Sequence, residues 1–332
     1  SKLMTSAFVT GGSGFLGRNL IHYLKSHGRT VHAIGRSESA RATIEGLGAV
    51  AFPGDLDNVE AMTAAAQGCI EAYHCAASVT MTGDIGEMRK VNVGGTESVI
   101  KACKAAGVKR FVHVSTEQAI IGVGKLLVSA DETWPYPERP LGSYAATKQE
   151  AERLALSASS AEMEIMAARP RLIWGNDDSV CLPQFVAAVK SGDLVWAGGG
   201  RHRTSTCHVT NVCEGLLCCA ERGKGGEAYF FTDGEPVEFR SFVEQMLAAV
   251  DVKAPTKEIP LPLVKFAASA GELWQKVSGR APVVNHAVIN VLLQECTVVD
   301  AKARADIGYT GAVSIEQGVE DLARRHKEST SR

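Results

Sequence analysis

Residues 10–17 read TGGSGFLG, and this stretch decides the fold because it sets four glycines between an apolar run and a helical pattern. Inside regular structure each glycine costs about 0.5–1 kcal/mol relative to alanine, so four together need a physical reason. The apolar run at residues 7–10 predicts a strand, and the spacing of the apolar residues over 14–25 predicts a helix. A G-x-G-x-x-G turn between a strand and a helix is typical of dinucleotide binding.

Three of these glycines have distinct expected roles. The first turn of a helix offers free amides and the positive end of the helix dipole, where a pyrophosphate can bind if no side chain blocks it. We expect Gly11 to make the turn, Gly14 to admit the phosphates and Gly17 to let the helix close on the sheet. The alternative, a glycine-rich turn without a ligand, is less favoured in this context.

The following chain alternates apolar runs with helical patterns. Strands are expected at residues 30–35, 49–55, 71–77, 110–116 and 164–170, and long helices at 86–106 and 141–160. This alternation predicts an α/β fold, a doubly wound parallel sheet of the Rossmann type. We expect a dinucleotide-binding domain over residues 1–170 and a smaller, mainly substrate-binding part over 171–328, with residues 205–235 returning to the first domain.

Composition narrows the class of protein. The 332 residues carry a net charge of −2 and are 45% hydrophobic, which fits a globular protein and argues against nucleic-acid binding. Nine cysteines without paired spacing indicate reduced thiols. Apolar runs are far shorter than a bilayer span, and the start of the sequence leaves no room for a signal peptide. We therefore expect a cytoplasmic protein without a membrane span.

The end of the second expected strand bears on the choice of dinucleotide. NAD sites usually carry an acid there for the ribose 2′-hydroxyl, whereas this chain has Gly35, Arg36 and Ser37. Arg36 therefore favours NADP, with NAD as the alternative cofactor and an ordinary surface arginine as the alternative role. Asp55 follows the third strand, where it can either accept from the adenine amino group or cap a helix.

The segment YAATK at residues 144–148 suggests the catalytic pair. Tyr144 and Lys148 lie four residues apart on an expected helix, so their side chains share one face. A free tyrosine has a pKa near 10, and a neighbouring ammonium favours its phenolate. The pair becomes informative in combination with the glycine turn.

With these residues the chain resembles the short-chain dehydrogenase/reductase superfamily, in particular its extended branch and the 3β-hydroxysteroid dehydrogenase/isomerase-like and sterol-dehydrogenase-like members. Nearly the whole chain takes part in the resemblance. The segments that carry it, besides the two motifs above, are KVNVGGTESVIKAC (90–103), RPRLIWG (169–175), PLPLVKFAASAGELW (260–274) and TVVDAKARADIGY (297–309).

The resemblance implies a dehydrogenase or reductase acting on CH–OH groups. In such an enzyme Tyr144 exchanges a proton with the carbinol or carbonyl oxygen of the substrate, and Lys148 favours the phenolate and holds the nicotinamide ribose. It implies a third catalytic hydroxyl in HVSTEQAIIG (113–122), either Ser115 or Thr116, with Thr116 matching the family pattern. Asn92 is expected either to support the cofactor or Lys148 through a water, or to cap a helix. Further cofactor contacts are expected at Phe15, Leu16, Leu56, Ala76, Pro170 and Arg171. Members of the family often dimerise through the helices that correspond to residues 86–106 and 141–160, so the resemblance allows a homodimer, while the sequence itself does not give the oligomeric state.

The sequence leaves several substrate classes to be weighed against each other. Nucleotide-sugar members carry an arginine where this chain has Thr204, and a threonine cannot replace a bidentate partner of a diphosphate. An apolar, steroid-like small molecule is therefore favoured over a nucleotide sugar, with a smaller ketone or aldehyde as a further alternative. A non-catalytic NADP sensor is the alternative of another class.

Several other side chains have two interpretations. Trp174, Trp196 and Phe185 either line a hydrophobic pocket or belong to the core, and Arg171 either contacts the cofactor or forms a surface salt bridge. His202, Cys207 and His208 lack a fourth ligand at a recognised spacing, so no metal is expected. His208 is expected to be an inward strand residue with a backbone partner.

Overall fold

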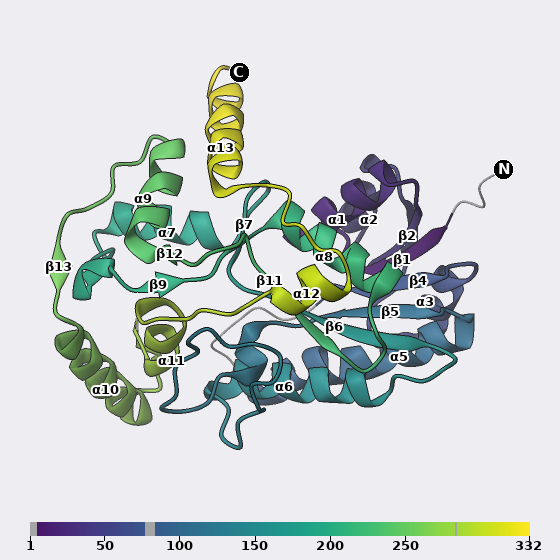
Figure 1. Ribbon diagram of the computed structural model, residues 1–332, viewed down its shortest axis with the longest axis horizontal. Coiled ribbons are helices and arrows are strands. Elements are labelled where there is room, and N and C mark those ends of the chain that lie inside the picture. Colours follow the sequence, from purple (N-terminus) through teal and green to yellow (C-terminus); the bar gives the residue numbers. More distant parts are fainter. Residues whose placement is uncertain (1–4, 77–83, 283) are drawn as a thin grey trace.

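The computed structural model describes residues 5–76, 84–282 and 284–332, built around a parallel sheet (Figure 1). Seven strands pair in the order β11-β6-β5-β4-β1-β2-β3. They are β1 (Ser6–Thr10), β2 (Thr30–Gly35), β3 (Val50–Pro53), β4 (Glu71–His74), β5 (Arg110–Val114), β6 (Glu164–Pro170) and β11 (Ala228–Phe231). The doubly wound α/β fold is confirmed. Three expected strands end earlier than predicted, at Pro53, His74 and Val114, and Ala77 of the predicted fourth strand lies outside the described residues.

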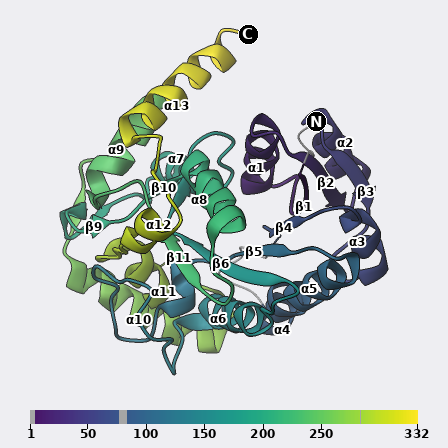
Figure 2. The ribbon, with the colours of Figure 1, turned by 45° about the vertical axis from the view of Figure 1, so that its right-hand side comes forward.

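Helices cover both faces of this sheet, as Figure 2 shows. Successive residues of β1 point to opposite faces, with Ala7 and Val9 packing into one core and Phe8 into the other. Because both faces are buried, the strand reads as a continuous apolar run. One face carries α1 (Phe15–Ser26), α2 (Glu38–Gly46), α8 (Val209–Arg222) and α12 (Ala301–Asp306), and the other carries α3 (Val59–Ala66), α5 (Gly95–Ala106) and α6 (Gly142–Ser157).

The helix predicted at 86–106 contains an irregular turn. It consists of α4 (Ile85–Arg89), the π-helical turn η1 (Lys90–Gly94) and α5 in direct succession. Asn92 lies inside this turn, is buried, and donates from its side-chain amide to Thr147 Oγ1 at 3.1 Å. It does not cap a helix. Such bulges occur frequently at functional sites.

The chain after β6 builds a smaller part from short strands and helices (Figure 1). Its strand pairs are β7 (Ile173–Trp174) with β10 (Cys207–His208), β9 (Arg203–Thr204) with β12 (Val237–Glu238), and β8 (Trp196–Ala197) with β13 (Glu258–Ile259). Its remaining helices are α7 (Cys181–Ser191), η3 (Gly198–Gly200), α9 (Phe239–Ala249), α10 (Leu261–Ser278), α11 (His286–Val288), η4 (Ile289–Leu293) and α13 (Ile315–Thr330).

Two features of this second part bear on the sequence interpretation. Between the short strand pairs, the chain returns to the large sheet, where β11 pairs with β6. Trp174 and Trp196 are fully buried core residues whose indole nitrogens donate to Asp233 and to the Pro255 carbonyl. Among the described residues, no helix is both long and apolar enough to cross a bilayer.

Candidate active site

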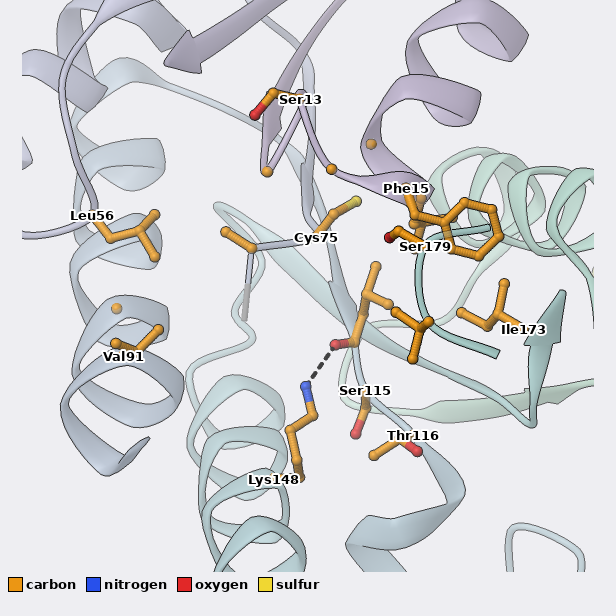
Figure 3. A pocket seen from close by; sticks show the side chains of 18 of the residues that line it. Ser13, Phe15, Leu56, Cys75, Val91, Ser115, Thr116, Lys148, Ile173 and Ser179 are labelled. Atoms are coloured by element: carbon orange, nitrogen blue, oxygen red, sulfur yellow. Dashed lines mark hydrogen bonds between the residues drawn. The ribbon is translucent and has the colours of Figure 1, made fainter. Parts of the chain in front are cut away.

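A cavity of about 1180 Å³ opens at the carboxyl ends of the central strands, the edge at which open α/β sheets bind ligands. In Figure 3, Leu56 and Val91 lie on one wall, Phe15 and Ile173 lie on the opposite wall, and Cys75 lies between them. The cavity is lined by every residue predicted for the site except Asn92. These are Gly11, Gly14, Phe15, Leu16, Gly17, Arg36, Asp55, Leu56, Ala76, Ser115, Thr116, Tyr144, Lys148, Pro170 and Arg171.

The glycine turn is built by close backbone approaches. Gly11 has φ +69°, and a Cβ there would lie 2.8 Å from the Ala76 nitrogen. A Cβ on Gly17 would lie 1.9 Å from the Gly11 oxygen, so only glycine lets α1 pack this near the turn. Gly14 is the N-cap of α1 and supplies no capping side chain, which leaves the first amides of the helix open toward the cavity. This bare cradle fits the pyrophosphate of a dinucleotide.

The rim of the cavity carries an ion pair between two of the residues expected to contact the cofactor. Arg36 is 82% exposed, and its guanidinium lies 3.9 Å from the Asp55 carboxylate. Asp55 Oδ1 accepts from the Leu56 amide at 2.7 Å, while Asn58 caps α3 by accepting from Ala61. The helix-cap alternative for Asp55 is therefore wrong.

Tyr144 and Lys148 lie on α6, on the side that faces β5. Lys148 Nζ donates to the Val114 carbonyl at 3.2 Å (Figure 3). Burial lowers the pKa of Lys148 to about 8, with Glu152 and Cys75 acting in the opposite direction. Burial, together with the nearby Glu117 carboxylate, raises the pKa of Tyr144 above its usual value, so this phenol holds its proton firmly.

The two candidate hydroxyls have different surroundings. Thr116 is half-buried, and its Oγ1 donates to Glu117 Oε2 at 2.7 Å. Ser115 is buried, and its hydroxyl has no hydrogen-bond partner among the described residues. Burial raises the pKa of the Glu152 carboxyl, but Arg169, Tyr136 and Ser115 lower it by more. Thr116 is thus hydrogen-bonded to Glu117, the carboxylate that helps to raise the pKa of Tyr144.

Glu117 is the functional residue that the sequence interpretation missed. It lines the cavity, and its Oε1 lies 3.0 Å from Arg171 Nη1, with both side chains at most 3% exposed. Arg171 also donates to Thr204 Oγ1 at 3.1 Å and to the Val291 carbonyl. The surface salt bridge considered for Arg171 is wrong, because the pair is buried. An acid directly after two hydroxyl residues and before an apolar run was the available signal.

The far end of the cavity is mainly apolar. Its walls come from the segment after β6 including β7, from α7 with the residues just before it, and from η4; the apolar members are Leu172, Ile173, Val180, Phe185, Val291 and Leu292, and Ser179 and Gln184 are polar members. Thr204 is buried against Arg171, whereas Arg201 and Arg203 lie outside the cavity lining and bond to Glu258 and to the Pro236 carbonyl. Of the three aromatics considered, Phe185 alone lines the cavity.

The remaining histidine and cysteine candidates have ordinary structural partners. His208 Nδ1 accepts from the Thr210 amide at 3.1 Å, so the expected backbone partner is confirmed, and His202 Nε2 bonds to the Leu292 carbonyl at 2.6 Å. Within the described ranges, no three histidine, cysteine, aspartate or glutamate side chains cluster to hold a metal ion. All nine cysteines are free thiols.

Two histidines lie directly opposite each other in the sheet below Lys148. His74 and His113 are partners in the register of β4 and β5. His74 bonds to Thr10 at 2.7 Å and to Thr96 at 3.2 Å, whereas neither ring nitrogen of His113 has a hydrogen-bond partner among the described residues. Burial, with Lys148 nearby, lowers the pKa of His74 to about 3 and that of His113 well below its usual value. Both rings are therefore neutral.

The sequence of this chain matches one family model and individual proteins of known name. Residues 8–263 match the sequence model of the 3-beta hydroxysteroid dehydrogenase/isomerase family. The chain is 44% identical to a 4-hydroxy-2-methyl-3-oxo-4-farnesyl-3,4-dihydroquinoline-1-oxide ketoreductase of Stigmatella aurantiaca, covering 95% of each chain. It is 32% identical to a 2-alkyl-3-oxoalkanoate reductase of Stenotrophomonas maltophilia, covering 95% of this chain and 97% of the relative.

Solved structures agree on the fold. The UDP-glucose 4-epimerase of Thermotoga maritima, solved with UDP-glucose, superposes with a TM-score of 0.76 at 18% identity and covers 98% of this chain and 100% of the epimerase. At that identity the likeness concerns the arrangement of the elements.

The histidine pair yields a stability prediction. Replacing His113 with leucine removes two buried polar atoms without partners, so we expect the free energy of unfolding at pH 7 to rise by about 1–2 kcal/mol. Both native rings stay neutral, while unfolded histidines take up protons below about pH 6.5. Native stability therefore falls as the pH drops from about 6.5 toward 3, and this fall should be shallower in His113→Leu. Urea titrations across this range measure both effects.

The matched control is His74→Leu, which removes one hydrogen bond from each of the Thr10 and Thr96 hydroxyls and should cost about 1–3 kcal/mol. Each hydroxyl keeps another bond, because the Ala76 amide still donates to Thr10 and Thr96 still donates to the Asn92 carbonyl. Equal losses in the two variants would show that His113 has a bonding partner after all.

Proposed function

The chain belongs to the 3-beta hydroxysteroid dehydrogenase/isomerase family, and we propose that it transfers hydride between NADP and a secondary alcohol or ketone on an apolar, steroid-sized substrate. The relative with 44% identity is named a ketoreductase of a farnesylated quinoline, which favours reduction of a ketone. A smaller carbonyl compound is the second candidate, supported by the relative named as an oxoalkanoate reductase.

The observation that carries this proposal is one continuous cavity. It begins at the bare glycine turn, passes Tyr144, Lys148 and Thr116, and ends between the apolar walls of α7 and η4. A dinucleotide along the strand ends would direct its nicotinamide toward Tyr144, and the apolar end would receive the substrate.

The chain's own residues handle the proton. Bound NADPH would supply the hydride from its nicotinamide ring. Tyr144, whose raised pKa keeps it protonated, would donate its proton to the carbonyl oxygen as that oxygen gains charge. The Lys148 ammonium would stabilise the phenolate left behind, and its pKa of about 8 allows it to carry that charge at neutral pH.

Thr116 would fix the reacting oxygen. A hydroxyl has one proton to donate and two lone pairs; Thr116 gives its proton to Glu117 and accepts from the Gln118 amide, so one lone pair is left for a bound alcohol. Binding a ketone would require the hydroxyl to turn from Glu117 toward the carbonyl oxygen. Glu117 would thereby act as a positioning residue for Thr116.

Two alternatives from the sequence are less well supported. A nucleotide sugar needs cations for its diphosphate, but Arg171 at the substrate end is bound to Glu117, and Thr204 is bound to Arg171. A non-catalytic NADP sensor would not need Tyr144 and Lys148 beside the cavity.

The proposal is tested first by Tyr144→Phe. This variant keeps the ring but loses the proton donor, so kcat for NADPH oxidation should fall at least ~100-fold while NADPH affinity is kept. The assay uses a panel of steroid ketones, aromatic ketones and nucleotide sugars, with Tyr23→Phe as the control on α1. Unchanged turnover in Tyr144→Phe would reject the assigned acid, and absence of turnover across the panel in the parent protein would favour the sensor.

The choice between the hydroxyls is tested by Thr116→Ala and Ser115→Ala. Because Thr116 is half-buried and bonded to Glu117 whereas Ser115 is buried, we expect kcat to drop about 100-fold in Thr116→Ala and by less than ~5-fold in Ser115→Ala. Steady-state kinetics with the preferred ketone measures both. The reverse ranking would assign the role to Ser115.

Cofactor preference is tested by Arg36→Ala. Loss of a charged partner for the 2′-phosphate should weaken NADPH binding about 10- to 100-fold and leave NADH binding unchanged. Titration calorimetry with both cofactors measures this. Arg201→Ala is the matched control, because Arg201 is also an exposed arginine paired with an acid, Glu258 at 3.4 Å, but lies outside the cavity lining. Equal weakening for NADH would remove the 2′-phosphate role.

A further inference from the structure

The ion pair between Glu117 and Arg171 lies in the wall of the cavity. Both side chains line it, their charged groups are 3.0 Å apart, and neither is more than 3% exposed. The reacting oxygen of a substrate has to lie within reach of Tyr144 and Thr116. Because Thr116 Oγ1 donates to Glu117 Oε2 at 2.7 Å, a substrate held for reduction lies close to the Glu117 carboxylate.

The charge of Arg171 is used within the protein. One terminal nitrogen lies 3.0 Å from Glu117 Oε1, and the other donates to Thr204 Oγ1 at 3.1 Å and to the Val291 carbonyl. Its Nε is buried and has no hydrogen-bond partner among the described residues. A guanidinium held in this way offers a substrate carboxylate neither an uncompensated charge nor the two parallel N–H groups that bind carboxylates well.

The other cations on the described part of the lining are placed elsewhere. Lys148 donates to the carbonyl at the end of β5 at 3.2 Å, and Arg36 is 82% exposed at the rim. Lys90 is exposed in η1, whose Val91 lies on the wall opposite Ile173 (Figure 3). Among the lining residues that the structure describes, the apolar end therefore has no cation free for an anionic substrate.

The charge of Glu117 is felt at the reacting groups. Burial raises the pKa of the Tyr144 phenol, and the Glu117 carboxylate raises it further. A carboxylate separated from the substrate carbonyl by a single carbon would lie in the same region. Two like charges brought together in a site shielded from water repel each other strongly, so binding of such a substrate is disfavoured.

From this arrangement we propose that the Glu117–Arg171 pair determines substrate specificity: it admits neutral ketones and rejects oxo acids, whose carboxylate lies next to the reacting carbonyl. The inference rests on the proposed ketone reduction and narrows its substrate class to neutral carbonyl compounds. Specificity of this kind comes from a repulsive group directed against one class of ligand, and Glu117 is that group. The apolar walls would bind the same alkyl chain in either class, so the charge makes the difference.

The test compares 3-oxododecanoate with its methyl ester, which share the ketone and the alkyl chain. In the parent protein we expect kcat/KM with NADPH to be at least ~100-fold higher for the ester, mainly through KM. Glu117→Gln keeps the size of the side chain but leaves the Arg171 charge uncompensated, so a substrate carboxylate can take its place. This variant should narrow the ratio to about 3-fold or less. Any loss of activity common to both substrates cancels in the ratio.

Two control variants separate charge from structure. Glu117→Asp keeps the negative charge and should retain the parent ratio. Glu152→Gln is the matched control, because Glu152 is also a buried acid bonded to an arginine, Arg169 at 2.8 and 2.6 Å, but lies outside the cavity lining. It should leave the ratio of ester to acid unchanged, whatever its effect on overall activity. Circular dichroism identifies the variants that are folded.

A binding measurement distinguishes this inference from the proposed function. The alcohols 3-hydroxydodecanoate and its methyl ester cannot be reduced by NADPH, so titration calorimetry with the NADPH-loaded protein gives their affinities without turnover. The parent should bind the ester at least ~30-fold more tightly. This result would support the inference even if no ketone were reduced, an outcome that would reject the proposed function alone. Equal affinities for acid and ester in the parent, or the parent ratio in folded Glu117→Gln, would overturn the inference.

Discussion

The buried ion pair between Arg171 and Glu117 connects the two parts of the molecule. Glu117 belongs to η2 (Glu117–Ile120), directly after the candidate hydroxyls, and Arg171 follows the end of β6. Through its other contacts Arg171 also holds Thr204 of β9 and the carbonyl of Val291 in η4. Breaking a buried pair by removing one partner typically costs about 3–5 kcal/mol, because a charge is left without compensation. The apolar wall and the catalytic corner are therefore fixed relative to each other.

A second buried pair, two residues earlier, holds the catalytic helix. Arg169 of β6 donates to both carboxylate oxygens of Glu152 at 2.8 and 2.6 Å, and Tyr136 donates to the same carboxylate. Glu152 lies one helical turn after Lys148 on α6. Arg169 at the end of β6 thus orients α6, and Arg171 just after β6 orients the segment that carries Ser115, Thr116 and Glu117. Both elements are therefore held at the cavity by the same strand end.

Local motifs made much of the fold and site predictable. The glycine turn and the Tyr144–Lys148 spacing are short segments whose geometry follows from a few neighbouring residues. The Glu117–Arg171 pair joins residues 54 positions apart, so the local signal at Glu117 could not show that this acid would meet Arg171. The same applies to Trp174 and Trp196, because composition alone does not tell whether an aromatic side chain faces a cavity or the core. The π-turn at Asn92 was hidden because its sequence has ordinary helical periodicity.

That π-turn limits how the chain can change in length. Glu87 of α4 lines the cavity before the widened turn, and Gly95 and Ser98 of α5 line it after that turn. Deleting one residue within η1 would turn the two segments relative to each other by roughly 100° and rotate one of these sets away from the cavity. Among descendants of this sequence, gene-level insertions and deletions should therefore accumulate in the surface loops and spare this helix.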